Sequence, residues 1–402
     1  MLSFRIYFDY KELEINNEKK YFSKKLKELK SKLGISKEQM DEDWKNKIFS
    51  KYWREFDPFY HDKKVIAILG NTFNVTNAWL KCYELINYFN LIPDDVKDSF
   101  LHFDNAAFPG SFILSTHHYV NTHRKWGSKY KWNASSLLNI NSQNSTPLED
   151  KYELYKNYPK NWLMDENNNG DVLIRKNQED FIKKIGGIVD LYTSDLGFDV
   201  SSDYNNQELL QLPANIGQIL SGILTLKKGG CFITKQYMTF EMTTISIMFA
   251  LSQMFDEFYL CKPYTSREAN SETYLVGKGF KGGFDIKHPY IEAMFDRIEG
   301  KIDIEIPLFD AKSYPKKYIP FITKITGTIF NRQIDKLEHD IKNSRKCVLS
   351  NFNDKHSNNP IVKEFINSEL HKVEKWYIDN IIYPISDDNL LNMYDHLYQN
   401  IH

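Results

Sequence analysis

The segment DNAAFPGSF, residues 104–112, decides the fold class of this 402-residue chain. It follows the apolar run 100–103, which predicts a buried strand, and it precedes an apolar pattern with helical spacing. An acid at the end of a strand, followed by a tight Pro-Gly turn that opens a helix, is typical of the place where a doubly wound sheet holds a nucleoside-bearing cofactor. The segment therefore predicts an α/β protein with parallel strands.

Helical and strand patterns alternate on both sides of this segment, as expected for a parallel sheet with crossover helices. The predicted helices are residues 76–89, a helix after Gly110, 207–226 and 240–255. The predicted strands are residues 99–103, 188–193, 231–235, 257–261 and 273–277. Too few residues separate the last two strands for a helical crossover, so they should form an antiparallel hairpin at or near the sheet edge.

The regions that flank this alternation read as mostly helical extensions. We expect an N-terminal extension over 1–70, a catalytic domain over 71–285 and a C-terminal region over 286–402, with one strand at 302–306. The polar stretch 139–168 is read as a surface insertion. The sequence thus predicts one Rossmann-like domain with additions at both ends.

Four charged residues stand at the end of, or beside, hydrophobic runs and could meet in one pocket: Lys81, Asp195, Lys235 and Glu272. Forty residues separate the second from the third, enough for one strand-helix-strand unit, which brings both to the carboxyl edge of a parallel sheet. Each residue alone could be a surface or capping residue. Together they predict a catalytic site.

Several strings occur in the order found in one family. These are YKWNASSLL (130–138), NNGDVLI (168–174) and KPYTSREANSETYLVGKGF (262–280). With them, residues 74–283 resemble the FtsJ-like ribose 2'-O-methyltransferases, most closely the Adrift-type, cap-specific branch of eukaryotes and large DNA viruses. The resemblance implies a methyltransferase fold with S-adenosylmethionine as cofactor.

The resemblance also implies roles for individual residues. Lys81, Asp195, Lys235 and Glu272 match the family's catalytic set, with Lys235 as the proton acceptor. The cofactor-binding residues would be Asp104, Pro109, Gly110, Ser111, Phe112, Asp171 and Val172. Arg267 and Asn270 would bind substrate phosphate or position Glu272, because a guanidinium suits phosphate.

The chain departs from the family at Phe108 and Ser111, where glycines are common. The bulk of Phe108 is expected to narrow the approach to the methionine part of the cofactor. A lysine base must also be neutral, whereas an ordinary lysine with a pKa of about 10.4 is protonated. Burial and the second ammonium, that of Lys81, are expected to lower the pKa of Lys235 toward about 7 to 8.

Composition is that of a soluble enzyme, with 42% hydrophobic residues and a net charge of −1. RNA affinity must therefore come from local patches. The apolar stretch 245–255 is too short to span a membrane, and the N-terminal segment has no secretory pattern. The four cysteines have no CxxC spacing, which favours reduced core thiols and no metal site. A cytoplasmic location is expected, in the host cytoplasm or the virion if the protein is viral.

Other patterns have ordinary explanations beside functional ones. The lysine-rich segment 19–32 is read first as an amphipathic helix and second as an RNA contact. The histidines of THHYVNTH (116–123) are read as surface residues, and GKGFKG (277–282) does not open a helix as a dinucleotide motif would. Five aromatic residues could stack on a methylated guanine or on RNA bases, although core packing is commoner. They are Trp53, Tyr60, Trp126, Tyr130 and Trp132.

The leading hypothesis is methyl transfer to the ribose 2'-hydroxyl of capped, single-stranded mRNA. The alternatives are a ribosomal or transfer RNA ribose methyltransferase and an inactive RNA-binding or scaffold relative. The flanking regions could form an RNA platform, a self-association surface or a contact to a capping enzyme. Sequence alone leaves open the cap pocket, the first or second transcribed nucleotide as target, and the oligomeric state.

Overall fold

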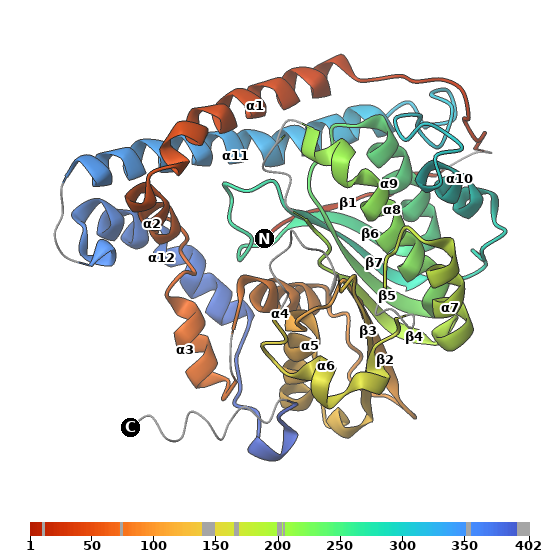
Figure 1. Cartoon of the computed structure of the whole chain (residues 1–402), viewed down its shortest axis with the longest axis horizontal. Helices are drawn as coiled ribbons and strands as arrows, with labels where there is room; N and C mark the ends of the chain where they lie inside the picture. The colour runs from red at the N-terminus through yellow and green to blue at the C-terminus, as the bar shows by residue number, and fades with distance from the viewer. Residues whose placement is uncertain are drawn as a thin grey trace.

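A seven-stranded mixed sheet forms the centre of the molecule (Figure 1). The computed structural model describes residues 1–9, 13–72, 75–138, 149–164, 169–198, 203, 206–350 and 355–391, without the side chains of residues 41 and 42. Its strands are β1 (Leu2–Arg5), β2 (Phe100–Asn105), β3 (Tyr130–Ser135), β4 (Val189–Ser194), β5 (Leu226–Gln236), β6 (Phe255–Lys262) and β7 (Thr273–Phe280). The strand order is β1-β6-β7-β5-β4-β2-β3.

The sheet confirms the Rossmann-like class. Strands β3, β2, β4 and β5 are parallel neighbours, and β7 lies antiparallel between β5 and β6. The predicted terminal hairpin is therefore confirmed. Two strands were not predicted: β3, within the string 130–138, and β1, which pairs antiparallel with β6 and covers that edge. The strand expected at 302–306 is wrong, because these residues form turns.

Helices cover both faces of the sheet. In Figure 1, α4 (Asn77–Phe89) and α5 (Ser111–His123) lie on one face. The other face carries α7 (Arg175–Ile185), α8 (Gln207–Thr225), α9 (Met242–Met254) and α10 (Pro289–Ile298). Neighbouring strand residues such as Leu191 and Tyr192 enter the two opposite hydrophobic cores, as the alternation of side chains along a strand requires. A short helix, α6 (Leu154–Asn157), follows β3.

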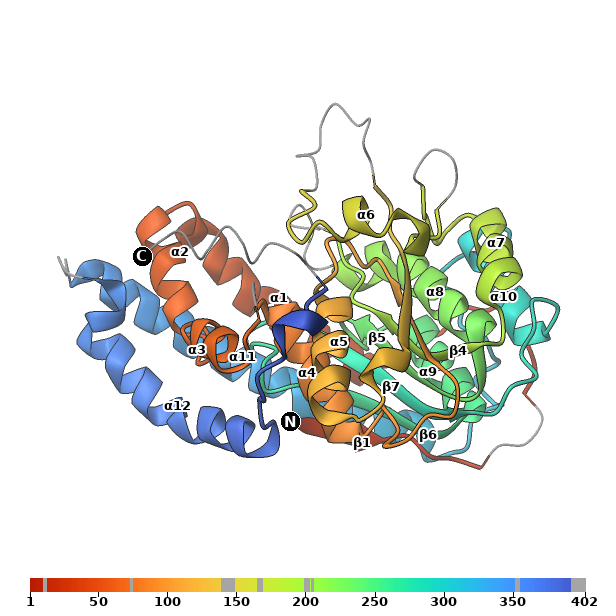
Figure 2. The same ribbon diagram turned by 90° about the horizontal axis from the view of Figure 1, so that it is seen from below.

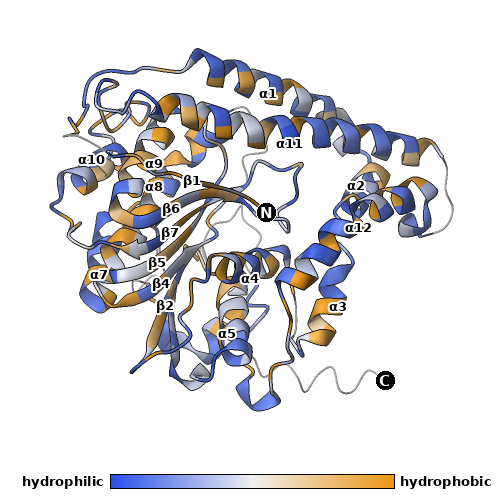
Figure 3. Cartoon of the chain, turned by 180° about the vertical axis from the view of Figure 1, so that it is seen from behind, coloured by the Kyte–Doolittle hydropathy of each residue, from blue (hydrophilic) through white to orange (hydrophobic). Residues whose placement is uncertain are grey.

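The N- and C-terminal extensions pack against each other. Figure 1 shows α1 (Lys24–Trp44) beside the long α11 (Tyr318–Leu349). Figure 2 shows α2 (Lys47–Glu55), α3 (Asp62–Leu69) and α12 (Pro360–Asp379) gathered beyond one end of the sheet. Hydropathy follows this layering: the strands are mostly apolar, whereas α1 and α11 carry many polar residues (Figure 3). Short 3-10 helices occur at Gly127–Lys129, Pro159–Asn161, His356–Asn358 and Asp387–Asn389.

The predicted amphipathic helix at 19–32 corresponds to part of α1. Leu26 is fully buried and Leu29 packs against the core, whereas Phe22 precedes the helix and is exposed. The structure thus supports the helical interpretation of this lysine-rich segment and leaves RNA contact there untested. None of the described helices combines the length and apolar character needed to cross a bilayer.

Candidate active site

The four residues predicted to form the catalytic set converge at one edge of the sheet. Lys81 lies in the middle of α4, whose start is capped by the Thr76 hydroxyl, which accepts from the backbone N–H of Trp79 at 3.1 Å. Asp195 directly follows β4, and Lys235 is the penultimate residue of β5. Glu272 directly precedes the antiparallel β7, so it reaches the same edge as the carboxyl ends of β4 and β5.

These side chains form an alternating chain of ion pairs, here called the tetrad. Lys81 Nζ donates to both carboxylate oxygens of Glu272 at 2.9 Å and lies 3.7 Å from Asp195 Oδ2. Lys235 Nζ donates to the main-chain oxygen of Asp195 at 2.7 Å and lies 3.2 Å from its Oδ1. Both lysines are more than nine-tenths buried. Two ammonium groups and two carboxylates balance each other, which makes their shared burial tolerable.

Three further side chains hold Asp195 and Glu272 in place and were not identified from the sequence. Tyr274 donates its hydroxyl to Asp195 Oδ1 at 2.7 Å, and Ser266 donates to Glu272 Oε1 at 2.9 Å. Lys262 Nζ donates to the main-chain oxygen of Glu272 at 2.7 Å. Burial lowers the pKa of Lys262 to about 7. Tyr274 and Lys262 belong to β7 and β6, so the terminal hairpin supplies the support.

The expected lowering of the Lys235 pKa is not what this structure shows. Burial does act to lower it, but the nearby carboxylates of Asp195 and Glu272 outweigh burial and raise the pKa of Lys235 above its ordinary value. The reverse holds for Glu272: burial alone would raise its pKa, yet the ammonium groups of Lys81 and Lys235 hold it at about 2. Lys235 and Glu272 are therefore both charged in the free protein.

A cavity of about 460 Å³, here called the donor cavity, opens at the carboxyl ends of β2, β3 and β4. Its lining comprises Asn105, Ala106, Phe108, Ser136, Leu137, Gly170, Asp171, Val172, Leu173, Asp195, Leu196, Gly197, Phe198 and Ala214. Asp195 connects it directly to the tetrad. Gly170 approaches the end of β3 so closely that a Cβ would lie 2.2 Å from Ser135 Oγ. The size is within the range of about 300 to 1,000 Å³ usual for small-ligand pockets.

The donor cavity suits a polar nucleoside ligand. Asn105 lines it, and both amide atoms of this buried side chain lack a hydrogen-bond partner among the described residues. Buried amide groups in native proteins are normally satisfied, so a polar ligand group is the expected partner. Asp171 lies on the same wall, where its Oδ1 accepts from the Leu173 N–H at 2.9 Å. The Phe108 side chain also lines the cavity, and its ring packs edge-on against the Trp162 ring with 5.9 Å between the ring centroids.

Of the seven predicted cofactor residues, Asp171 and Val172 line the donor cavity. The other five are not among its lining residues: Asp104, Pro109, Gly110, Ser111 and Phe112. Asp104 is buried, accepts from the Thr193 hydroxyl at 2.6 Å, and has a pKa raised well above its usual value by burial. Gly110 adopts a φ of 120° at the start of α5, a conformation that favours glycine. Direct cofactor contact by these five residues stays a prediction.

The predicted substrate residues follow β6, in the loop before Glu272. The Arg267 guanidinium donates to the main-chain oxygen of Trp53 and lies over the Trp53 ring at 4.6 Å from its centroid. Asn270 Oδ1 accepts from Lys262 Nζ at 2.8 Å and from the N–H of Glu272 at 3.3 Å. Asn270 thus contacts the Glu272 backbone, whereas Arg267 is directed to the helical extension. Phosphate binding by either residue stays a prediction.

The histidines, tryptophans and cysteines that stood out in the sequence lie outside the tetrad. His118 is buried, contrary to its interpretation as a surface residue, and its Nε2 lies 3.0 Å from the Gly70 carbonyl oxygen. Within the described ranges, no cluster of histidine, cysteine and acidic residues could hold a metal ion. Trp53, Trp126 and Trp132 are mostly buried, so core packing accounts for much of their surface. All four cysteines carry free thiols.

The parallel sheet with an antiparallel last strand and a cavity beyond its carboxyl edge defines the class of Rossmann-like methyltransferases. The model of the family described as FtsJ-like methyltransferase matches residues 74–280, about half of the chain. The chain belongs to the FtsJ-like methyltransferase family.

The chain is also similar to two other proteins in sequence and to one solved structure. The "Probable methyltransferase EP424R" of African swine fever virus is 35% identical over 297 residues, which cover 71% of this chain and 67% of that protein. The mouse (Mus musculus) cap-specific mRNA (nucleoside-2'-O-)-methyltransferase 2 is 31% identical over 230 residues, which cover 54% of this chain and 30% of that protein. The structure of human Methyltransferase-like protein 13 in complex with SAH matches with a TM-score of 0.28 at 12% identity, over 63% of this chain and 88% of that one.

Proposed function

We propose that this protein transfers a methyl group from S-adenosylmethionine to the ribose 2'-hydroxyl of RNA, at the nucleotide next to the 5' cap of mRNA. The observation that carries the proposal is the meeting of Lys81, Asp195, Lys235 and Glu272 beside the donor cavity. Membership of the FtsJ-like family and similarity to a cap-specific 2'-O-methyltransferase support it. We place the reaction in the cytoplasm, on single-stranded capped RNA.

In the donor cavity, Asp171 and Asn105 would hold the nucleoside part of the cofactor, which supplies an electrophilic methyl group on a sulfonium. Asp195 belongs to both the cavity lining and the tetrad, so the reacting groups would meet at this end of the cavity. As the ribose oxygen takes the methyl group, neutral Lys235 Nζ would accept the proton of the 2'-hydroxyl. In-line attack requires the hydroxyl and the methyl group to be held together, which the rigid sheet edge provides.

Lys235 is charged in the free protein and must lose its proton before it can act as the base. Lys81 and a cationic sulfonium would both favour the neutral amine, whereas Asp195 and Glu272 oppose it. The two carboxylates then orient the two lysine side chains, at the cost of a higher Lys235 pKa. Methyl transfer should consequently accelerate as pH rises.

Three RNAs test the proposal with labelled cofactor: a short capped RNA, its uncapped twin, and the capped RNA with a 2'-deoxy first nucleotide. Label on the first alone is expected, and Lys235→Ala should abolish it without loss of cofactor binding by calorimetry. Equal labelling of the capped and uncapped RNAs would favour a general RNA methyltransferase. Label on the 2'-deoxy RNA would move the target to another position. An absence of both cofactor binding and labelling would favour a scaffold protein.

A further inference from the structure

A second cavity, of about 400 Å³, lies on the other side of the tetrad and is here called the lateral cavity. One wall comes from the catalytic domain and the other from α1, α2 and α11 of the two extensions. Its lining comprises Lys37, Met40, Trp53, Gln207, Tyr237, Arg267, Ala269, Asn270, Ser271, Glu272, Gln333 and Leu337. The extensions therefore complete a cavity that the catalytic domain alone leaves open.

The tetrad separates the donor cavity from the lateral cavity. Asp195 lines the donor cavity, whereas Glu272 lines the lateral one. Tyr237 also lines the lateral cavity, and the Lys235 ammonium lies 5.3 Å from the centre of its ring. A group bound in the lateral cavity would thus reach the tetrad at Glu272 and Tyr237, whereas a methyl donor in the donor cavity would reach it at Asp195.

The lining of the lateral cavity has the chemistry that recognises an unstacked nucleobase. Tyr237 packs partly against the hydrophobic core and also lines the cavity, where an aromatic ring can stack with a base. The Arg267 guanidinium is fixed in place by Trp53, whose ring also stacks with Phe49 at 6.0 Å. Bases stack on aromatic rings and on guanidinium planes alike, and side-chain amides can read their edges.

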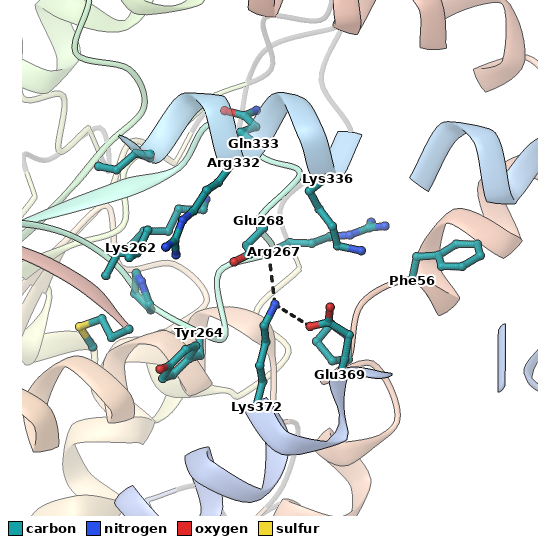
Figure 4. Close-up of a pocket in the computed structure, with 15 residues that line it drawn as sticks. Phe56, Lys262, Tyr264, Arg267, Glu268, Arg332, Gln333, Lys336, Glu369 and Lys372 are labelled. Carbon is teal, nitrogen blue, oxygen red and sulfur yellow. Dashed lines mark hydrogen bonds and ion pairs between the residues drawn. The ribbon is translucent and has the colours of Figure 1, made fainter. Parts of the chain in front are cut away.

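A smaller pocket of about 90 Å³ adjoins the lateral cavity and shares Arg267 and Gln333 with it (Figure 4). Its other charged residues are Lys262, Glu268, Arg332, Lys336, Glu369 and Lys372. Lys372 pairs with both acids, at 3.3 Å and 2.6 Å, so the acids of this pocket are already neutralised in part. Arg332 projects from α11 into the pocket and makes no hydrogen bond or ion pair within the described part of the chain. Lys336 and Arg267 lie close to Asp340, so the unmatched positive charge of this pocket is that of Arg332.

We propose that the lateral cavity binds the base of the acceptor nucleotide in a single-stranded RNA, and that the adjoining cationic pocket binds a phosphate of the same strand. This inference rests on the proposed function and adds that the N- and C-terminal extensions form half of the RNA site. The RNA runs between the catalytic edge and α11, with Tyr237 against the base and Arg332 against the backbone.

Direct RNA binding, measured by fluorescence anisotropy without cofactor, tests the base site. Tyr237→Leu removes the ring but keeps apolar bulk, and should raise the Kd for a short RNA about 5- to 100-fold. Tyr237→Phe should restore most of the affinity. Met40→Trp should fill the lateral cavity and weaken RNA binding as well, whereas Leu349→Trp, at an 81% exposed position on the same α11 that forms the wall, serves as the control. The donor cavity should be unaffected, with an unchanged cofactor Kd for every variant.

Salt dependence tests the phosphate site. Arg332→Gln should reduce the slope of log K against log salt by about 0.7, the value for one phosphate contact to a single strand. Lys346→Gln is the charge-matched control, because Lys346 lies 14 residues after Arg332 on α11, about 21 Å from it along the helix axis. Unchanged RNA affinity in Tyr237→Leu and Met40→Trp, with methyl transfer intact, would overturn the inference and leave the proposed function standing. RNA binding that responds as described, in a protein that transfers no methyl group, would support the site and refute the reaction.

Discussion

We expect the charge on Asp195 to set the pH at which Lys235 can act as the base, and Asp195→Asn tests this expectation. Asp195 Oδ1 lies 3.2 Å from Lys235 Nζ, and its side chain is 19% exposed. At this separation the Coulomb energy is about 5 kcal/mol for an effective dielectric constant of about 20. Since one pKa unit corresponds to about 1.36 kcal/mol, removal of the charge should lower the Lys235 pKa by about two to four units.

The assay is the single-turnover rate of methyl transfer on capped RNA across pH, at saturating cofactor and RNA. The wild-type rate should rise with pH, because the carboxylates of Asp195 and Glu272 oppose the loss of the Lys235 proton. In Asp195→Asn the midpoint of this rise should move about two or more pH units lower. The maximum rate should also fall, because the carboxylate no longer orients Lys235. Asp180→Asn, which removes an exposed carboxylate paired with Lys176, is the control. An unchanged midpoint in Asp195→Asn would refute the role of Lys235 as the titrating base.

Three further predictions concern the cavity, the tetrad and the core. Asp171→Ala should weaken cofactor binding by about 1 to 3 kcal/mol in calorimetry, and equal affinity would place the nucleoside elsewhere. Gly197→Ala should slow methyl transfer about 100-fold with little change in melting temperature, because the new Cβ would lie 2.9 Å from Lys235 Nζ. Burial and Glu241 raise the pKa of Glu208 from 4.5 to about 7, so the folded state favours its neutral form. The stabilisation from protonated Glu208 should be complete below pH 4.5, and the free energy of unfolding should fall by about 3 kcal/mol as pH rises through 7. Urea unfolding of Glu208→Gln should show no such fall.

The parallel core was predictable because its strands are buried on both faces. Such strands read as short apolar runs bounded by turn residues, a form seen in β2, in β4 and in the second half of β5, from Cys231 onward. The edge strands lack that signal. β1 has only four residues, none of them buried, and β3 alternates polar and apolar residues. Their assignment depends on pairing with β6 and β2, which no local pattern reveals.

The tetrad was predictable as a set, but the direction of the Lys235 pKa was not. The prediction weighed burial and the second lysine, which both lower a lysine pKa, and did not count the two acids of the set as raising it. The fold brings the Asp195 carboxylate to 3.2 Å from Lys235 and adds the field of Glu272, which together reverse the sign. The supporting donors were also hidden, because Tyr274 reads as an ordinary strand residue until its hydroxyl is placed on Asp195.

The charge balance of the tetrad links base activation to the occupancy of the donor cavity. Lys81 and Lys235 are matched by Asp195 and Glu272, so the buried set is neutral in the free protein and Lys235 keeps its proton. Asp195 belongs both to the tetrad and to the lining of the donor cavity. A cation bound there would therefore compete with Lys235 for the same carboxylate and lower the Lys235 pKa. The neutral amine would then form mainly when a cationic methyl donor is in place, which confines the reactive form of the site to the complex that can use it.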